Sequence, residues 1–270
     1  MGNERTEGVI TRGTTHPNRL RRIDRWLIAC HGEVLTKGAE PPVVVDLGYG
    51  ASGVTSAEWH ARLRAVRPNV EVVGLEIDPA RVEAALPYAR EGLSFARGGF
   101  EVPLQGRSAR VIRAINVLRQ YGEDEVAPAW ESMQRRLDPD GLLIEGTCSE
   151  LGRLGSWVVL DRERPLTLTL SWRLRDLTEQ SLPPSIVAER LPKVLIHRNV
   201  SGEPIHALLA DLDQAWAHAS AIAPFGPRQR MIAAVEALAQ DWPIRGGAKR
   251  WRLGEVSVDW RAVAPVGQRA

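Results

Sequence analysis

Short apolar runs alternate with segments of helical spacing over the first half of the chain. A short run of β-branched and aliphatic residues predicts a buried strand, whereas apolar residues three or four positions apart predict a helix. The expected strands are residues 42–47, 70–76, 93–96, 110–118 and 142–146. The expected helices are residues 20–31, 55–67, 80–90 and 123–137. Strands and helices that alternate in this way predict a parallel sheet with right-handed crossovers.

The pattern changes in the second half of the chain. Two further strands are expected at residues 157–160 and 166–172. The spacer before the first of them is too short for a helical crossover, which needs about a dozen residues or more, so the order of the last strands stays open. Helical spacing then appears near residues 184–197, 204–221 and 227–241, and the alternating segment 251–260 predicts a last strand.

The first predicted strand runs directly into a glycine-rich turn. Gly48, Gly50 and Gly53 have the spacing Gly-x-Gly-x-x-Gly, which lets a backbone turn tightly and approach a ligand. That spacing alone fits any nucleotide-type cofactor. Asp46 lies two residues before the first glycine, where a carboxylate repels a pyrophosphate and suits the ammonium and sulfonium groups of S-adenosylmethionine (SAM).

The second predicted strand ends in another acid, Glu76, and Pro79 stands near the start of the helix that follows. In Rossmann-like βαβ units, an acid at the end of the second strand accepts hydrogen bonds from ribose hydroxyls. Glu76 is therefore a second candidate for cofactor binding.

Two segments resemble the first two motifs of class I SAM-dependent methyltransferases, namely Asp46-Leu47-Gly48-x-Gly50 and Gly74-Leu75-Glu76-Ile77-Asp78-Pro79. The resemblance covers residues 41–147 and implies SAM as the cofactor. It implies an α/β fold with a Rossmann-like, mostly parallel seven-stranded sheet, helices on both faces and a C-terminal helical insertion. The cofactor-binding residues that follow are Asp46, Gly48, Tyr49, Gly50, Gly53, Glu76, Ile77, Gly99, Phe100 and Asn116.

On this basis the chain divides into four parts. Residues 1–40 form an N-terminal segment and helix, and residues 41–174 form the SAM-binding core. Residues 175–250 form the helical insertion, and residues 251–270 the final strand and tail.

Three positions near the expected site depart from that family or distinguish among its members. Ser52 stands where a glycine is common, and Gly99 stands where an aspartate often accepts from the adenine amino group. Glu101 or a backbone carbonyl is expected to take over that contact. Asn116-Val117-Leu118-Arg119 differs from the Asn-Pro-Pro-Tyr and Pro-Cys segments of nucleobase methyltransferases. Asn116 either lines the pocket or caps the turn that follows it.

Hydroxyls, a histidine and arginines gather before the first helix, in residues 11–22. One interpretation is a lid over the cofactor, in which Arg12 or Arg19 binds a carboxylate or phosphate and His16 acts as a general base. The alternative is that Asn18 caps the helix and the arginines are solvated.

Composition narrows the function classes. The chain has 270 residues, 44% of them hydrophobic, and a net charge of +2, so its bulk charge implies no acidic partner. A concentrated basic face with interleaved aromatics is missing, which disfavours nucleic acid. Cys30 and Cys148 lack metal-ligand spacing, so no metal site is expected. Two isolated cysteines also suit a protein of the reducing cytoplasm. No long apolar run or signal-peptide pattern is visible, which predicts a cytoplasmic protein without a membrane span.

The sequence therefore predicts a SAM-dependent methyltransferase that acts on an unidentified acceptor, expected to be a small molecule. Positioning supplies much of the rate of methyl transfer, so no dedicated catalytic residue is assigned. Two alternatives stay open. An NAD(P)-dependent oxidoreductase is disfavoured by Asp46 and by the lack of a Tyr-x-x-x-Lys pair, and the other alternative is a SAM-fold protein without catalysis. The oligomeric state, with a homodimer as one option, is not fixed.

Overall fold

The computed structural model describes residues 6–10 and 13–267. The chain forms two compact units. The first comprises Met1–Gly152 and Leu160–Arg164, and the second comprises Arg153–Val159 and Pro165–Ala270.

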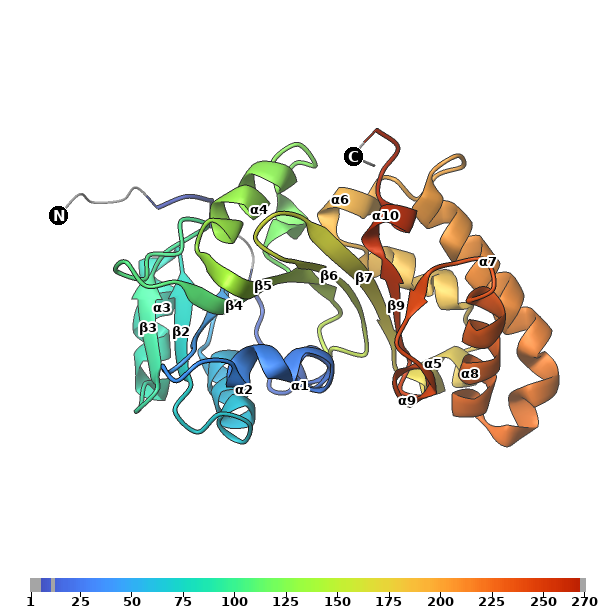
Figure 1. Cartoon of the computed structure of the whole chain (residues 1–270), viewed down its shortest axis with the longest axis horizontal. Helices are drawn as coiled ribbons and strands as arrows, with labels where there is room; N and C mark the ends of the chain where they lie inside the picture. Colours follow the sequence, from blue (N-terminus) through green and yellow to red (C-terminus); the bar gives the residue numbers. More distant parts are fainter. Residues whose placement is uncertain (1–5, 11–12, 268–270) are drawn as a thin grey trace. The chain divides into compact units, whose positions relative to one another are not determined.

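The first unit contains a doubly wound parallel sheet (Figure 1). Its strands are β1 (Val43–Leu47), β2 (Glu71–Glu76), β3 (Leu93–Arg97), β4 (Ala109–Ile115) and β5 (Leu137–Cys148). They lie in the order β3-β2-β1-β4-β5, and each neighbouring pair is parallel. This is the Rossmann-like arrangement that the alternating pattern predicted, and that expectation is confirmed. The strand order reverses between β1 and β4, the position at which such sheets bind ligands beyond the carboxyl ends of their strands.

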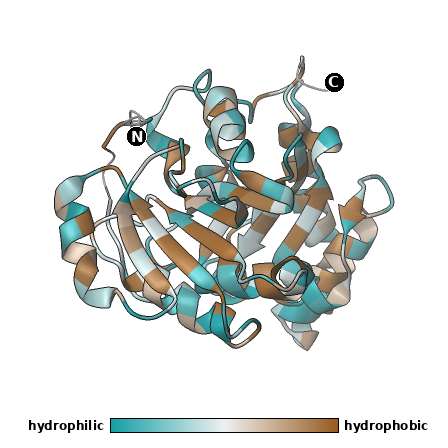
Figure 2. Cartoon of the chain, turned by 60° about the vertical axis from the view of Figure 1, so that its left-hand side comes forward, coloured by the Kyte–Doolittle hydropathy of each residue, from teal (hydrophilic) through white to brown (hydrophobic). Residues whose placement is uncertain are grey.

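Helices cover both faces of this sheet. They are α1 (Arg21–Thr36), α2 (Val54–Arg64), α3 (Pro79–Ala85) and α4 (Val126–Gln134), with short 3₁₀ turns η1 (Leu86–Tyr88) and η2 (Leu118–Gln120). In Figure 1, α1 and α2 lie on one face and α4 on the other. All five residues of β1 are consequently buried, and the apolar colouring of the strands in Figure 2 follows from this double cover. Trp59 and Leu63 of α2 are fully buried.

The second unit contains the remaining strands and most of the remaining helices. Its strands are β6 (Leu154–Leu160), β7 (Pro165–Trp172), β8 (Ile244–Arg245) and β9 (Glu255–Asp259), in the order β6-β7-β9-β8. Strand β9 is antiparallel to both β7 and β8. The helical segments are α5 (Leu174–Glu179), η3 (Pro184–Arg190), α6 (Lys193–Ile196), α7 (Pro204–His218), η4 (Ala219–Phe225), α8 (Pro227–Leu238), α9 (Ala248–Trp251) and α10 (Trp260–Val263).

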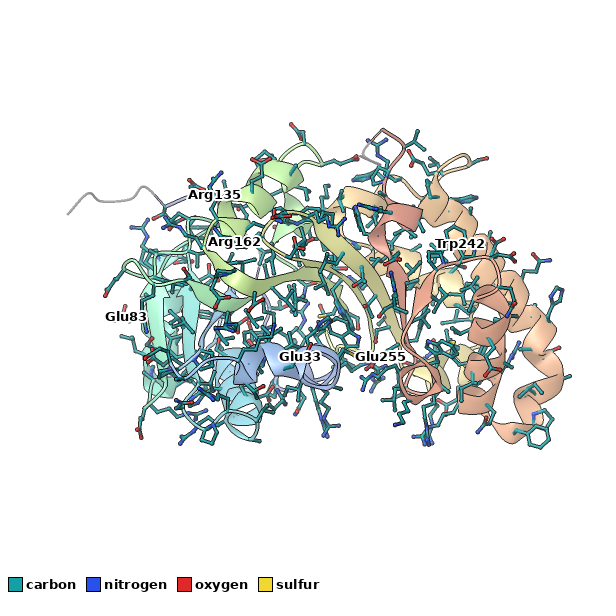
Figure 3. All side chains as sticks on the ribbon, in the orientation of Figure 1. Glu33, Glu83, Arg135, Arg162, Trp242 and Glu255 are labelled. Atoms are coloured by element: carbon teal, nitrogen blue, oxygen red, sulfur yellow. The ribbon has the colours of Figure 1, made fainter. Side chains whose placement is uncertain are left out.

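Apolar and charged side chains separate as burial requires. Leu208 and Leu212 of α7 and Met231 and Val235 of α8 are almost wholly buried. Figure 3 shows the side chains as sticks. The side chains of Glu83, Arg135 and Arg162 are exposed, whereas the side chain of Glu255 is buried and pairs with Arg250. In the described part of the chain, no helix has the length and apolar character needed to cross a membrane.

Several element boundaries differ from the sequence-based expectation. The described residues form nine strands rather than seven, partly because the two-residue β8 is too short to show alternation. The helical pattern at 184–197 splits into η3 and α6, because a proline at position 192 cannot continue a helix. The last strand is limited to Glu255–Asp259, with one-turn helices on both sides.

Candidate functional site

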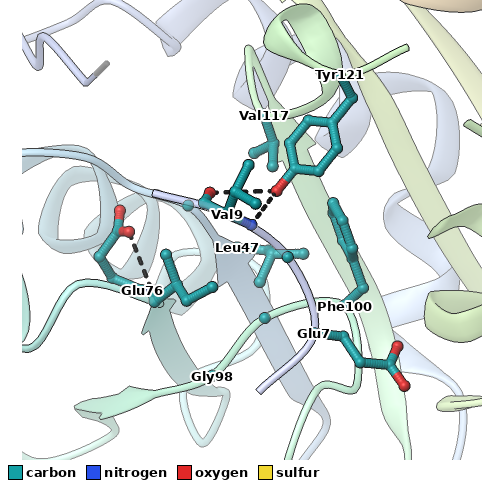
Figure 4. A pocket seen from close by; sticks show the side chains of 12 residues that line it. Glu7, Val9, Leu47, Glu76, Gly98, Phe100, Val117 and Tyr121 are labelled. Atoms are coloured by element: carbon teal, nitrogen blue, oxygen red, sulfur yellow. Dashed lines mark hydrogen bonds between the residues drawn. The ribbon is translucent and has the colours of Figure 1, made fainter. Parts of the chain in front are cut away.

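A cavity lies at the carboxyl ends of the first four strands, within the first unit (Figure 4). The lining residues follow β1, β2, β3 and β4 in the chain or belong to the N-terminal segment. They are Glu7, Gly8, Val9, Leu47, Gly48, Glu76, Ile77, Gly98, Gly99, Phe100, Val117 and Tyr121.

The glycine turn brings the backbone against this cavity. Gly48 and Gly50 have φ values of +67° and +84°, which side chains rarely adopt. A Cβ on Gly48 would lie 2.7 Å from a Val117 methyl group. Gly48 lines the cavity, whereas Gly50 and Gly53 do not. Gly53 precedes α2, where a Cβ would lie 2.8 Å from the Phe95 ring, so close packing accounts for this glycine.

Glu76 lines the cavity, and its carboxylate is held by the backbone around it. Its Oε2 accepts from the N–H of Gly50 at 3.0 Å, and its Oε1 accepts from the N–H of Ile77 at 3.0 Å. Arg81 Nη1 lies 3.7 Å from Oε2. The N–H of Asp78 also donates to Oε1, at 3.4 Å. A carboxylate offers about four acceptor positions, so these three backbone donors leave capacity for a hydroxyl of a ligand.

The carboxylate of Asp46 does not line the cavity but belongs to a buried charge network. Arg113 of β4 donates to both of its oxygens, at 3.0 and 2.7 Å, and Ser56 Oγ donates at 2.6 Å. Arg113 also pairs with Asp24 of α1, and its guanidinium lies 4.0 Å from the centre of the Trp59 ring. The charge of Asp46 is thus compensated inside the fold.

Asp24 completes this network. Burial raises its pKa to about 6, while the charges of Arg113 and Arg62 act in the opposite direction. Arg62 Nη1 lies 2.7 Å from Asp24 Oδ2. The two carboxylates and two guanidinium groups therefore link α1, β1, α2 and β4.

Tyr49 and Asn116 also lie outside the lining residues. The Tyr49 ring packs edge-on against Phe95, with centroids 5.3 Å apart, and burial raises its pKa. Asn116 follows β4 with a φ of +65°. Its Oδ1 accepts from the Cys148 N–H at 2.9 Å, and its Nδ2 donates to the Cys148 Sγ at 3.4 Å. Asn116 therefore joins the ends of β4 and β5.

Five of the ten predicted cofactor-binding residues line the cavity, namely Gly48, Glu76, Ile77, Gly99 and Phe100. Sequence reasoning missed Tyr121, whose ring packs against Phe100 at a centroid distance of 5.3 Å. Tyr121 lies just after η2, at the same edge of the sheet, so its position in the sequence could have marked it as a candidate. The N-terminal residues 7–9 gave no such signal, because no periodicity or motif marks them.

Residues 13–19 lie against the glycine turn and α2. Thr15 Oγ1 donates to the Tyr49 carbonyl at 2.7 Å, and Arg19 donates to the carbonyls of Thr14 and of Ser149. Asn18 does not cap α1; the N-cap is Leu20, without a side-chain bond. Asn18 has a φ of +61°, and its side chain accepts from Arg62 at 3.2 Å instead. His16 is exposed, and Arg12 lies outside the described residues.

The cavity carries acidic rather than basic character. Its charged lining residues are Glu7 and Glu76, and neither lysine nor arginine is among the lining residues. Among the residues that the structure describes, no three His, Cys, Asp or Glu side chains are grouped as metal ligands.

Comparison with known proteins gives structural likeness without sequence likeness. No family model matches the chain, and no curated protein matches it. Magnesium protoporphyrin IX methyltransferase from Synechocystis PCC 6803, solved with bound S-adenosylhomocysteine (SAH), is 18% identical over 48% of this chain and 55% of that chain, with a TM-score of 0.37. The sugar N-methyltransferase from Streptoalloteichus sp ATCC 53650 is 18% identical over 63% of this chain and 72% of that chain, with a TM-score of 0.36.

The chain thus spans about half the length of the first of these proteins. A pericyclic reaction enzyme is matched over 30% of its own length, at 19% identity and a TM-score of 0.35 over 43% of this chain. TM-scores of this size give no basis for transferring a substrate or a site residue.

Proposed function

We propose that the protein is a SAM-dependent methyltransferase that acts on a small-molecule acceptor. The observation that carries this proposal is the Glu76 carboxylate, held by backbone donors in an acidic cavity beside the glycine turn. A sheet of this topology binds ligands at that edge.

The residues around the cavity fit the parts of this cofactor. Glu76 would accept from the ribose hydroxyls, and Gly48 leaves room for a ligand to approach the backbone. Ile77, Phe100 and Tyr121 provide apolar surface for the purine. The acidic lining suits the sulfonium and ammonium charges and would repel the pyrophosphate of NAD(P). Asp46 does not contribute to this preference, because Arg113 compensates its charge.

When bound, the cofactor supplies a methyl group on a positively charged sulfur. That methyl group would be transferred to a nucleophilic atom of the acceptor by displacement from the sulfur. The protein's part in such a displacement is to hold both reactants in line and exclude water, which does not require a catalytic acid or base.

Isothermal calorimetry with SAM, SAH and NADH tests the proposal. We expect both adenosyl ligands to bind with one site per chain and NADH to give no heat of binding. Binding of NADH without SAH would contradict the proposal. The alternative of a SAM-fold protein without catalysis is separated by incubation with methyl-labelled SAM and a panel of small-molecule amines and alcohols. Labelled product is the expected outcome.

A further inference from the structure

The N-terminal residues 7–9 line the cavity and bind polar groups beside it. The carbonyl of Glu7 accepts from the N–H of Phe100 at 3.0 Å. The N–H of Glu7 donates to Glu101 Oε2 at 2.7 Å, while Glu101 Oε1 accepts from the N–H of Gly99 at 2.9 Å. The Glu7 peptide edge therefore occupies one donor and one acceptor that follow β3.

Two further contacts fix the segment. The hydroxyl of Tyr121 accepts from the N–H of Val9 at 2.7 Å and lies 3.2 Å from its carbonyl oxygen, as Figure 4 shows. The Glu7 carboxylate accepts from Ser132 Oγ at 2.5 Å. The segment is thus bound through its backbone and one carboxylate, and not through the exposed side chain of Val9.

The backbone groups of Glu7 present the same pattern as the edge of an adenine ring. Adenine offers an amino N–H beside a ring nitrogen that accepts, and Glu7 offers an N–H and a C=O to the same pair of partners. The Phe100 N–H would donate to the ring nitrogen, and the Glu101 carboxylate would accept from the amino group. Apolar side chains of Ile77, Phe100 and Tyr121 also line this cavity, as a purine requires.

Glycines make room for the segment. Gly8 has a φ of +122°, and a Cβ there would lie 2.9 Å from the Tyr121 hydroxyl oxygen. A Cβ on Gly99 would lie 1.9 Å from the Glu7 carbonyl oxygen. A side chain at either position would exclude residues 7–9 from the cavity. Gly99 also stands at the position where class I SAM-dependent methyltransferases, which the sequence resembles, often have an aspartate.

We propose that residues 7–9 form an intramolecular plug that occupies the adenine subsite, so that an adenosyl ligand binds only after the plug has left. The inference rests on the proposed function, since it takes the cavity as the cofactor site. It assigns the contacts of the adenine edge to the Phe100 N–H and the Glu101 carboxylate, and it makes the N-terminal segment their competitor.

Calorimetric titration of SAH into three full-length proteins tests the plug. Gly8→Val removes the φ of +122° and the space that the plug needs, whereas Ile10→Ala changes an exposed side chain just outside the lining. We expect Gly8→Val to bind SAH at least fivefold more tightly than wild type and Ile10→Ala to bind like wild type. A chain that lacks residues 1–10 should match Gly8→Val, and thermal unfolding checks that each variant is folded.

Adenosine and inosine then test the mimicry on the chain that lacks residues 1–10. Inosine reverses the donor and acceptor of the adenine edge, so we expect adenosine to bind at least tenfold more tightly. Equal SAH affinity in wild type and Gly8→Val, or weaker binding in Gly8→Val, overturns the plug and leaves the proposed function standing. Absence of SAH binding in all variants contradicts the proposed function, and the plug with it.

Discussion

Glu76 concentrates four interactions on one buried carboxylate, three with backbone N–H groups and one with Arg81. Charge-assisted hydrogen bonds to ribose hydroxyls contribute roughly 1.5–3 kcal/mol each. We therefore expect Glu76→Ala to weaken SAH binding by about tenfold or more, as measured by calorimetry.

The matched control for this substitution is Glu71→Ala on the same strand. Glu71 pairs with Arg107 at the protein surface, where both side chains are about half exposed. Such pairs contribute little, so the SAH affinity and the melting temperature should both stay near the wild-type values. An unchanged dissociation constant in Glu76→Ala would place the ribose elsewhere.

A second carboxylate, Glu145 of β5, contributes to the pH dependence of stability. Its side chain is fully buried, and desolvation raises its pKa to about 8, with the Trp130 indole acting in the opposite direction. The folded chain therefore keeps a proton that the unfolded chain loses above its ordinary pKa of 4.5. Stability falls as pH rises through this interval, by up to about 1.4 kcal/mol per pH unit.

Substitution of Glu145 by Gln should remove that fall. We expect the free energy of unfolding of Glu145→Gln to exceed that of wild type by a growing amount between pH 6 and pH 8, as measured by urea denaturation. Other titrating groups cancel in the difference between the two proteins. A difference that does not change with pH would show that Glu145 ionises at its ordinary pKa in the folded chain.

At the scale of elements, Arg113 joins two carboxylates from β1 and α1 under the Trp59 ring. Removing one partner of a buried ion pair leaves uncompensated charge and costs about 3–5 kcal/mol. We expect Arg113→Met to lower the free energy of unfolding by that amount at pH 7. Addition of Asp46→Asn should recover part of the loss.

Arg107→Met provides the comparison for this network, because Arg107 is half exposed and pairs only at the surface. It should cost less than about 1 kcal/mol. Equal losses in the two Arg→Met variants would contradict a special role of the buried network.

Sequence patterns predicted most strands of the first unit well because β1, β2 and β4 are buried on both faces and read as apolar runs. The patterns failed where contacts between residues far apart in the sequence determine the role of a side chain. A carboxylate at the end of β1 looks available to a ligand, yet Arg113, 67 residues away, neutralises Asp46. Asn18 has the composition of a cap, but Arg62 of α2 holds its side chain. Such pairings depend on which strands and helices become neighbours.

At the scale of the whole molecule, every residue that lines the cavity belongs to the first unit. A ligand that binds only the folded state stabilises the structure around its site. We expect SAH to slow amide hydrogen exchange within Leu47–Tyr121 and to leave residues 165–263 unchanged, as measured by mass spectrometry of peptides. Slower exchange throughout both units would show that they unfold as one.

The N-terminal segment should respond in the opposite sense. Amides of residues 7–9 should exchange faster when SAH is bound, because their acceptors are then occupied by the ligand. The sequence-based hypothesis of a lid expects slower exchange over residues 8–19. The sign of the change in this one peptide therefore decides between a lid and a plug.

The contact between Glu7 and Phe100 joins two parts of one chain, and this has a consequence for dilution. A tethered competitor has an effective concentration set by its tether, so adding or removing protein does not change the fraction of molecules that are open. The apparent dissociation constant then equals the intrinsic one divided by that open fraction. The affinity for SAH should accordingly be the same in nanomolar and micromolar protein, and the length of the tether between residue 9 and α1 would adjust it, as the contacts of residues 7–9 do.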